Sequence, residues 1–435
     1  MAPDDLAARL RRGDASVFPG DSAAHSLGWL RHRERYVGDW LVSVEAQLPR
    51  RHPRTLVLGM GGSSSPARFF AEAAADETLS VLDTSNPDTI AATDFSGATV
   101  IASSKSGTTV ETQTLLAHAL ARGLDPKDLV VVSDPGTSLA ELAHALGALV
   151  IEGDPATGGR FSALSPFGLV PALYAGWSAE TLIGELAGGP VSDDEVAFAD
   201  DEARDLLDAS TGPGTFVTLR GDPVLSGGSL WLEQLIAETT GKSGVGVIPL
   251  AGHGGVYRPR EIMHFHLVAA LLARRLGVDP FNQPDVERAK RAVFELLSGA
   301  RTPRDAPVDV DGAFHDALYR TLQVYGPLAA SARVARLREA MTRRFAPTTA
   351  NLGPRYLHST GQLHTGGPEG VYALQVLLRP SSPPQRIEGR AYSFHDLHRA
   401  QADSDRLAML ALGRRVAVLE VDSLDEVDSL FDLAS

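Results

Sequence analysis

Short runs of Val, Ile and Leu alternate with longer Ala- and Leu-rich stretches through the first half of the chain. The runs cover residues 55–58, 79–82, 99–102, 129–132 and 148–151. Between them, residues 66–75 and 111–121 place apolar side chains at helical spacing. Strands that are apolar on both faces and separated by helices indicate a parallel sheet covered on both sides. The pattern therefore predicts an α/β fold.

A second, less regular set of apolar runs begins after about residue 210. Its strands are expected at 215–219, 245–250, 371–377 and 415–421. Residues 298–314 read as a connector or insertion, and residues 379–385 as a break before the C-terminal segment. We expect an N-terminal helical segment (1–50), two α/β domains (51–200 and 201–385) and a C-terminal helix and strand segment (386–435).

Composition narrows the class of protein. The chain has 435 residues, which favours two or more domains over a single core. Its formal net charge of −14 argues against nucleic acid or an anionic membrane as the main partner. The absence of cysteine excludes disulfides and thiolate chemistry. Without a signal-like or membrane-length apolar stretch, the expectation is a cytoplasmic protein.

A Gly-rich turn follows the first run, in the sequence VLGMGGSSSPARFF (57–70). Free N–H groups at a helix start attract anions, glycines let a ligand approach the backbone, and hydroxyls add donors. Pro66 suits the first turn of the following helix. A dinucleotide site is the main rival interpretation. However, the turn lacks the third Gly of that fingerprint, and Asp83 is the one acid at the end of the next strand.

The sequence SSKSGTT (103–109) repeats this arrangement one β-α unit later and crowds hydroxyl and ammonium groups around one glycine. Either turn alone is as readily explained as a simple capped turn. Two such turns at the carboxyl edge of one parallel sheet favour a ligand site, because such sheets bind ligands at that edge. The hydroxyl groups predict that the ligand carries a phosphate.

A third motif, GDPATGGRFSALSPFGLVPALYAG (153–176), places Arg160 after two glycines and just before a helix. A surface charge is the commonest role of an arginine. Close to two anion-binding turns, Arg160 could instead stabilise a developing oxyanion.

Together these motifs resemble the phosphoglucose isomerase family. Further stretches fit the resemblance: WLEQLIAETTGKSGVGVIPL (231–250), DPFNQPDVERAK (279–290) and YLHSTGQLHTGGP (356–368). The last pieces are most similar to the isomerase portion of fused transaldolase/phosphoglucose isomerase chains. The resemblance covers roughly residues 50–420. It implies two sugar-isomerase domains, each a mainly parallel sheet between helices, and usually a homodimer.

The resemblance also implies roles for individual residues. Glu238 matches the carboxylate that moves the proton between C2 and C1, Arg160 the arginine that stabilises the enediolate, and His358 the histidine that opens the sugar ring. The expected substrate and phosphate contacts are Gly62, Ser63, Ser104, Lys105, Ser106, Thr108, Thr109, Gly159 and Gln401.

The chemistry requires such a set independently. Interconverting an aldose and a ketose takes a base for the proton next to the carbonyl, charge stabilisation for the enediolate and proton transfer at the ring oxygen. One carboxylate, one cation and one imidazole suffice, so we expect no cofactor and no metal. His264 and His266 invite a metal interpretation, but the helical pattern around them would separate their side chains. His364 could line the pocket or be a structural histidine.

The sequence departs from the family near its C-terminus, where the family carries a glutamine followed by a lysine. Gln401 fits the first role, but no lysine follows Lys290, and His398 or Arg399 are the possible substitutes. The expected reaction is the interconversion of glucose 6-phosphate and fructose 6-phosphate through a cis-enediol. The alternatives are another hexose with an anionic C6 group, such as mannose 6-phosphate or a sulfosugar, and a non-catalytic sugar-phosphate-binding regulator.

Overall fold

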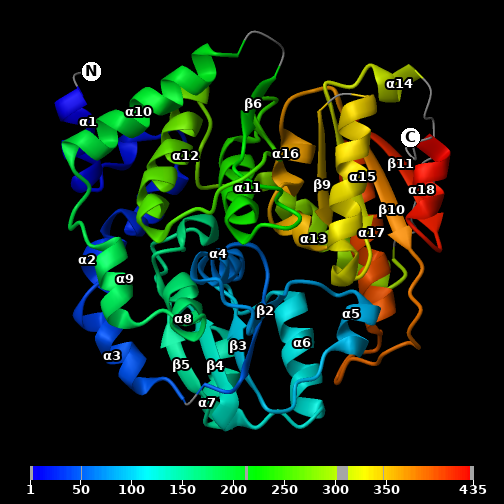
Figure 1. Ribbon diagram of the computed structural model, residues 1–435, viewed down its shortest axis with the longest axis horizontal. Helices are drawn as coiled ribbons and strands as arrows, with labels where there is room; N and C mark the ends of the chain where they lie inside the picture. The colour runs from blue at the N-terminus through cyan, green and yellow to red at the C-terminus, as the bar shows by residue number, and fades with distance from the viewer. Residues whose placement is uncertain (1–2, 50, 211–213, 301–311, 346, 432–435) are drawn as a thin grey trace.

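The computed structural model describes residues 3–49, 51–210, 214–300, 312–345 and 347–431. Two parallel sheets lie on either side of a central helix pair, α4 (Ser65–Ala74) and α11 (Gly227–Thr240), which pack against each other (Figure 1). Helices flank both sheets. The mixed α/β class with parallel sheets that the sequence predicts is confirmed.

The first sheet has the strand order β2-β1-β3-β4-β5, and each neighbouring pair is parallel. Its strands are β1 (Arg54–Gly59), β2 (Leu79–Leu82), β3 (Ala98–Ser103), β4 (Leu129–Ser133) and β5 (Leu149–Glu152). Each begins and ends within one residue of its predicted bounds. The chain leaves β1 for β2 on one side and crosses to β3 on the other, so the topological switch point lies between β1 and β3.

Helices cover both faces of this sheet, which explains why its strands read as continuous apolar runs. Val57, Val81 and Ile101 face α3 (Asp39–Gln47), α4 and α8 (Pro166–Tyr174). Leu58 and Val100 face the opposite layer. That layer contains α5 (Pro87–Ala92), α6 (Val110–Ala121) and α7 (Ser138–Leu146). Successive residues of a strand point to opposite faces, and both faces here are apolar.

The second sheet has the order β11-β10-β8-β9 and is also parallel. Its strands are β8 (Tyr319–Tyr325), β9 (Thr348–Leu352), β10 (Val371–Leu378) and β11 (Arg415–Val421). The strands β6 (Thr215–Thr218) and β7 (Val247–Leu250) form a separate parallel pair. The sequence pattern located β6, β7, β10 and β11 but missed β8 and β9, because buried polar residues interrupt their apolar positions.

Two layers of helices also cover the second sheet. One face packs on α15 (Ser331–Arg344) and α18 (Asp425–Phe431), and the other on α16 (Gly361–Gly366) and α17 (Phe394–Ala411). The remaining α-helices of the described chain are α1 (Pro3–Arg11), α2 (His32–Tyr36), α9 (Ala179–Leu186), α10 (Asp193–Asp208), α12 (Ile262–Leu276), α13 (Pro284–Leu297) and α14 (Gly312–His315).

The first 50 residues are helical where described, and α1 packs with α10 and α12 in one apolar cluster. Residues 379–385 form the expected break after β10. Most of the expected connector, residues 301–311, lies outside the described residues. Over the described ranges, none of the helices combines the length and the apolar character that crossing a bilayer requires.

Candidate active site

Two turns meet at the switch point of the first sheet. The β1–α4 turn contains a short 3₁₀ helix, Gly61–Ser63, and the Arg160 loop contains another, Gly159–Phe161. The two turns touch through their backbones, because a Cβ on Gly62 would lie 2.1 Å from the Gly159 carbonyl oxygen. Ser162 Oγ donates to the carbonyl oxygens of Gly62 (2.9 Å) and Gly159 (2.6 Å). Gly62 is thus needed for the close approach of the two turns.

The hydroxyl-rich loop after β3 lies beside the β1–α4 turn. The Lys105 backbone N–H donates to Ser63 Oγ (3.3 Å), and Ser104 Oγ donates to Thr109 Oγ1 (3.0 Å). The loop ends at helix α6, whose N-cap residue Thr109 makes no side-chain capping bond. The Thr109 side chain therefore does not cap the start of α6, and N–H groups at a helix start attract anions.

Two cavities lie at these turns and share His358: the first is at the β1–α4 turn and the second at the loop after β3. The first, of about 160 Å³, is lined by Met60, Gly61, Gly62, Ser63, Gly158, Gly159, Arg160, Gln234, Glu238, Phe281, Gln283 and His358. The second, of about 100 Å³, is lined by Ser106, Thr108, Thr109, Val110, Glu111, Val293, Phe294, Leu357, His358 and Gln401. The structure thus brings most of the expected site residues to two adjoining hollows.

Glu238 and Arg160 form a buried ion pair in the first cavity, each with 5% of its surface exposed. Arg160 Nη2 lies 3.4 Å from Glu238 Oε1, and Nη1 donates to the carbonyl oxygens of Glu238 (2.6 Å) and Pro280 (3.1 Å). Burial lowers the pKa of Arg160 from its ordinary value, and Glu238 opposes that change. The fixed carbonyl acceptors hold the guanidinium in one orientation, so it is organised before any negative charge develops beside it.

Gln234 orients the Glu238 carboxylate and was missed in the sequence analysis. Its Nε2 donates to Glu238 Oε2 (3.1 Å) and to the His358 carbonyl oxygen (2.9 Å), while its Oε1 accepts from Ser65 Oγ (2.8 Å). The available signal was its position four residues before Glu238, which places both side chains on one face of α11.

Glu111 is a second residue that the sequence analysis missed as part of the site. Its Oε1 lies 3.0 Å from His358 Nε2 and accepts a 2.6 Å hydrogen bond from Gln401 Nε2. Gln401 Oε1 in turn accepts from Ser85 Oγ (2.5 Å). The sequence feature that could have identified Glu111 is its position in the first turn of α6, directly after the hydroxyl-rich loop. Glu111 occupies the Nε2 side of the His358 ring, so a ligand would meet the ring through Nδ1.

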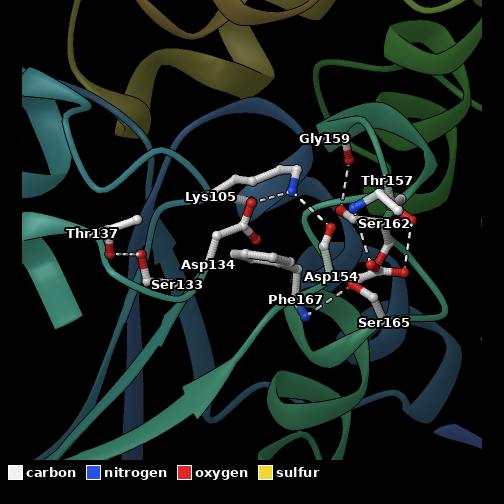
Figure 2. Close-up of polar contacts among 12 residues, drawn as sticks. Lys105, Ser133, Asp134, Thr137, Asp154, Thr157, Gly159, Ser162, Ser165 and Phe167 are labelled. Atoms are coloured by element: carbon white, nitrogen blue, oxygen red, sulfur yellow. Dashed lines mark hydrogen bonds and ion pairs between the residues drawn. The ribbon is translucent and has the colours of Figure 1, made fainter. Parts of the chain in front are cut away.

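Lys105 is oriented differently from the expectation of a phosphate contact. Its Nζ forms an ion pair with Asp134 and donates to the Asp154 carbonyl oxygen (2.8 Å), as Figure 2 shows. Among the residues described, Lys105 belongs to the lining of neither cavity, and Ser104 is likewise behind the cavity wall. Their contribution to the site therefore passes through the backbone and through neighbouring side chains.

The three residues considered for the family's C-terminal glutamine and lysine lie in different surroundings. His398 is buried, 3.0 Å from Ser85 Oγ through Nδ1, and burial lowers its pKa to about 3. Arg399 pairs with Asp403 and Glu420 on the other side of α17. In the described part of the chain, neither contributes to the walls of the two cavities, whereas Gln401 does.

The other histidines lie outside the site. His364 is buried 3.2 Å from both Thr321 Oγ1 and Gln323 Nε2, and burial lowers its pKa to about 3. His264 and His266 lie on helix α12, as the helical pattern predicted. His264 pairs with Glu202 at 2.7 Å, and His266 packs against Trp29. The described residues contain no group of three or more His, Asp or Glu side chains placed to hold a metal ion.

Lys242 is a buried cation near the ion pair that the sequence analysis also missed. Its Nζ donates to the Asp279 carbonyl oxygen, next to the Pro280 carbonyl that Arg160 contacts. Burial, reinforced by the nearby Arg160 charge, lowers the pKa of Lys242 to about 6. Lys242 and Arg160 together therefore fix the segment that follows helix α12.

Comparison with known proteins finds relatives named glucose-6-phosphate isomerase over part of the chain. No family model matches the chain. It is 31% identical over 266 residues to a glucose-6-phosphate isomerase from Rubrobacter xylanophilus, covering 58% of this chain and 54% of that protein. It is 33% identical over 225 residues to a probable glucose-6-phosphate isomerase from Haloarcula marismortui, covering 46% and 49%.

A solved glucose-6-phosphate isomerase from Chlamydia trachomatis matches 92% of this chain and 64% of its own, at 16% identity and a TM-score of 0.31. The chain spans about half the length of the curated relatives it matches. Over that span, the chain is a homologue of proteins named glucose-6-phosphate isomerase, as its motifs predicted.

Proposed function

We propose that the protein interconverts glucose 6-phosphate and fructose 6-phosphate through a cis-enediol or enediolate. The observation that carries the proposal is that Glu238, Arg160 and His358 line one cavity whose wall includes the Gly62–Ser63 turn. A base, a cation and an imidazole thus face one space beside a phosphate-suited loop. The curated relatives support the same reaction.

The substrate's phosphate would bind at the start of helix α6, where Ser106, Thr108 and Thr109 present hydroxyl groups at a cavity wall. A helix N-terminus and its N–H groups favour a dianion, and hydroxyls add hydrogen bonds in fixed directions. The protein's net charge of −14 repels anions at long range, so this local site must supply the attraction.

Ring opening would use His358. Its imidazolium form donates the Nδ1 proton to the ring oxygen as the C1–ring oxygen bond breaks. The C1 hydroxyl then passes its proton to the vacated Nδ1, which gives the open aldehyde and restores the imidazolium. Glu111 stabilises the imidazolium through Nε2 at 3.0 Å and fixes which nitrogen faces the sugar. Gln401 holds that carboxylate in place.

Isomerisation would use Glu238. Its carboxylate removes the proton on C2 of the open sugar, and the electron pair forms a C1–C2 double bond with negative charge on the C1 oxygen. Arg160 stabilises that charge. Glu238 then returns the proton to C1, while the proton of the C2 hydroxyl moves to the C1 oxygen, and a ketone forms at C2. These groups complete the reaction without a cofactor.

The test is a coupled assay on protein purified from a host that lacks this isomerase. We expect turnover of glucose 6-phosphate and fructose 6-phosphate that Glu238→Gln removes; that variant also measures any contaminating host enzyme. Turnover of mannose 6-phosphate or a sulfosugar in place of these substrates would change the substrate assignment. Binding without turnover of any of them would indicate a regulator and refute the enzyme.

The domain boundaries, the localisation and the oligomeric state are also part of this proposal. We divide the chain into a helical segment (1–50), two sugar-isomerase domains (51–200 and 201–385) and a C-terminal segment (386–435), and we propose a cytoplasmic homodimer. The family resemblance supports the dimer, and light scattering on the purified protein measures it directly: a monomeric mass would contradict it.

A further inference from the structure

Lys105 links three neighbouring strands of the first sheet at their carboxyl ends. Lys105 follows β3, and its Nζ pairs with Asp134, which follows β4, and donates to the carbonyl oxygen of Asp154, which follows β5 (2.8 Å). Figure 2 shows the ammonium group lying between these two partners. The Lys105 side chain therefore crosses the sheet edge and is held on the side of β4 and β5.

Asp134 is itself tightly positioned. Its backbone N–H donates to the Lys105 carbonyl oxygen (3.3 Å), so residue 105 is held at both its backbone and its side chain. Its carboxylate packs against Gly153, where an added Cβ would lie 2.6 Å from Asp134 Oδ1. Because Lys105 and Asp134 have only 21% and 17% of their side chains exposed, water screens this pair less than an ordinary surface pair.

Asp154 connects this pair to the Arg160 loop. Its carboxylate accepts hydrogen bonds from the Ala156 N–H (3.0 Å) and from Thr157 Oγ1 (3.2 Å), which fold the chain into the turn leading to Gly159 and Arg160. His32 of the N-terminal segment lies 3.0 Å from Thr157 Oγ1 and supports the turn from outside. A displacement of Asp154 would therefore move the loop that carries Arg160.

We propose that Lys105 is a positioning residue that holds the phosphate loop and the Arg160 loop at a fixed separation, rather than a cation that contacts the substrate's phosphate. The proposal rests on the proposed isomerase function. The phosphate and the enediolate lie at opposite ends of one sugar chain. A fixed separation between the loops therefore places the reacting carbons beside Glu238 and Arg160 once the phosphate is bound.

The two possible roles of Lys105, phosphate contact and loop positioning, predict opposite effects of substituting its partner Asp134. If Lys105 contacts phosphate, Asp134→Asn frees the ammonium group and phosphate binding stays equal or becomes tighter, whereas Lys105→Met weakens binding severely. If Lys105 positions the loops, the two variants act in the same direction, because Asp134→Asn removes the charge that holds the ammonium group in place and Lys105→Met removes the ammonium group itself. Displacing a catalytic group by about 1 Å can cost roughly 10²-fold in rate.

The experiment compares Lys105→Met, Asp134→Asn, the double variant and Lys105→Arg, with Lys127→Met as the control for loss of an exposed lysine. We expect kcat to fall about 10- to 100-fold in both single variants. The double variant should fall no further, and Lys105→Arg should recover part of the rate. KM for the sugar phosphate and inhibition by inorganic phosphate should change less than about threefold. Loss of phosphate inhibition in Lys105→Met, with none in Asp134→Asn, would overturn the proposal.

Hydrogen exchange separates failure of this proposal from failure of the isomerase function, because it needs no turnover. In the ligand-free protein, amides of residues 154–162 should exchange faster in Lys105→Met and in Asp134→Asn than in the wild type and in Lys127→Met. Unchanged exchange would refute the link whatever reaction the protein catalyses. Faster exchange in both variants, together with a wild type that turns over no sugar phosphate, would keep the link and refute the isomerase.

Discussion

Helix α11 carries two buried glutamates, five residues apart, that should respond in opposite ways to the same substitution. Glu238 lines the first cavity beside Arg160, whereas Glu233 has 1% of its surface exposed and accepts a 3.0 Å hydrogen bond from Asn351 Nδ2. Burial raises the pKa of Glu233 to about 8. Glu233 is therefore mostly uncharged at pH 7, and Glu233→Gln is a matched control for Glu238→Gln.

Glu238→Gln should remove isomerisation while leaving affinity for the sugar phosphate nearly intact. The amide keeps the shape of the side chain but cannot take the proton from C2. General-base catalysis contributes about 10²- to 10⁴-fold, which corresponds to roughly 3–5 kcal/mol of transition-state stabilisation. Glu233→Gln replaces a neutral acid by an amide of the same shape in a site that touches no substrate, so its kcat should stay within about twofold of the wild type.

The control variant Glu233→Gln should also change how the stability of the protein depends on pH. The pKa of Glu233 is near 8 when folded and about 4.3 when unfolded. The unfolded chain therefore loses this proton first as the pH rises. The stabilising contribution of the protonated group is complete below about pH 4 and is lost between pH 4 and 8, by on the order of 5 kcal/mol in total. Gln cannot ionise, so the melting temperature of Glu233→Gln should be closest to that of the wild type near pH 5 and should exceed it increasingly toward pH 8.

The assay combines steady-state kinetics at pH 7 with thermal unfolding from pH 5 to pH 8 for both variants and the wild type. Comparable loss of kcat in Glu233→Gln and Glu238→Gln would refute the assignment of the base to one of the two glutamates. A melting-temperature difference for Glu233→Gln that does not grow with pH would refute the argument from burial. Loss of substrate affinity in Glu238→Gln equal to its loss of turnover would place the base elsewhere.

Three further predictions test the phosphate loop, ring opening and metal dependence. Replacing Ser104 and Thr109 together by Ala should weaken binding of sugar phosphates and of inorganic phosphate alike, by about 10- to 100-fold; unchanged phosphate inhibition would contradict the assignment. His358→Ala should slow glucose 6-phosphate severely but only mildly slow an acyclic analogue of full length that lacks the 4- and 5-hydroxyls, provided that the wild type turns the analogue over. Equal losses on both would mean that His358 shapes the site or assists the enediol step. Activity should survive exhaustive EDTA treatment, and activity restored by added metal after chelation would revive a metal role for His264 and His266.

The sequence predicted strands reliably where burial of apolar side chains is the dominant physical effect. Strands β1 to β4 are largely buried and the edge strand β5 is partly buried, so the apolar runs marked all five to within one residue. Strands β8 and β9 failed the same criterion because their interior holds polar side chains that find partners from elsewhere. Gln323 contacts His364, and Asn351 contacts Glu233. A strand of this kind reads as a loop, because the partner that makes burial of a polar group tolerable is distant in sequence.

The sequence by itself determined the α/β class, the two anion-suited turns and the residue types that aldose–ketose chemistry needs. These properties depend on local spacing: glycines where backbones approach, hydroxyls before a helix, and a carboxylate near a helix end. Tertiary structure alone decided which of those groups share a cavity and which are held away from it. It paired Glu111 with His358 across 247 positions and joined Gln234 to Glu238 and His358. It also turned the Lys105 ammonium toward Asp134. The direction of a long charged side chain depends on the nearest opposite charge in space, and a local sequence pattern does not contain that position.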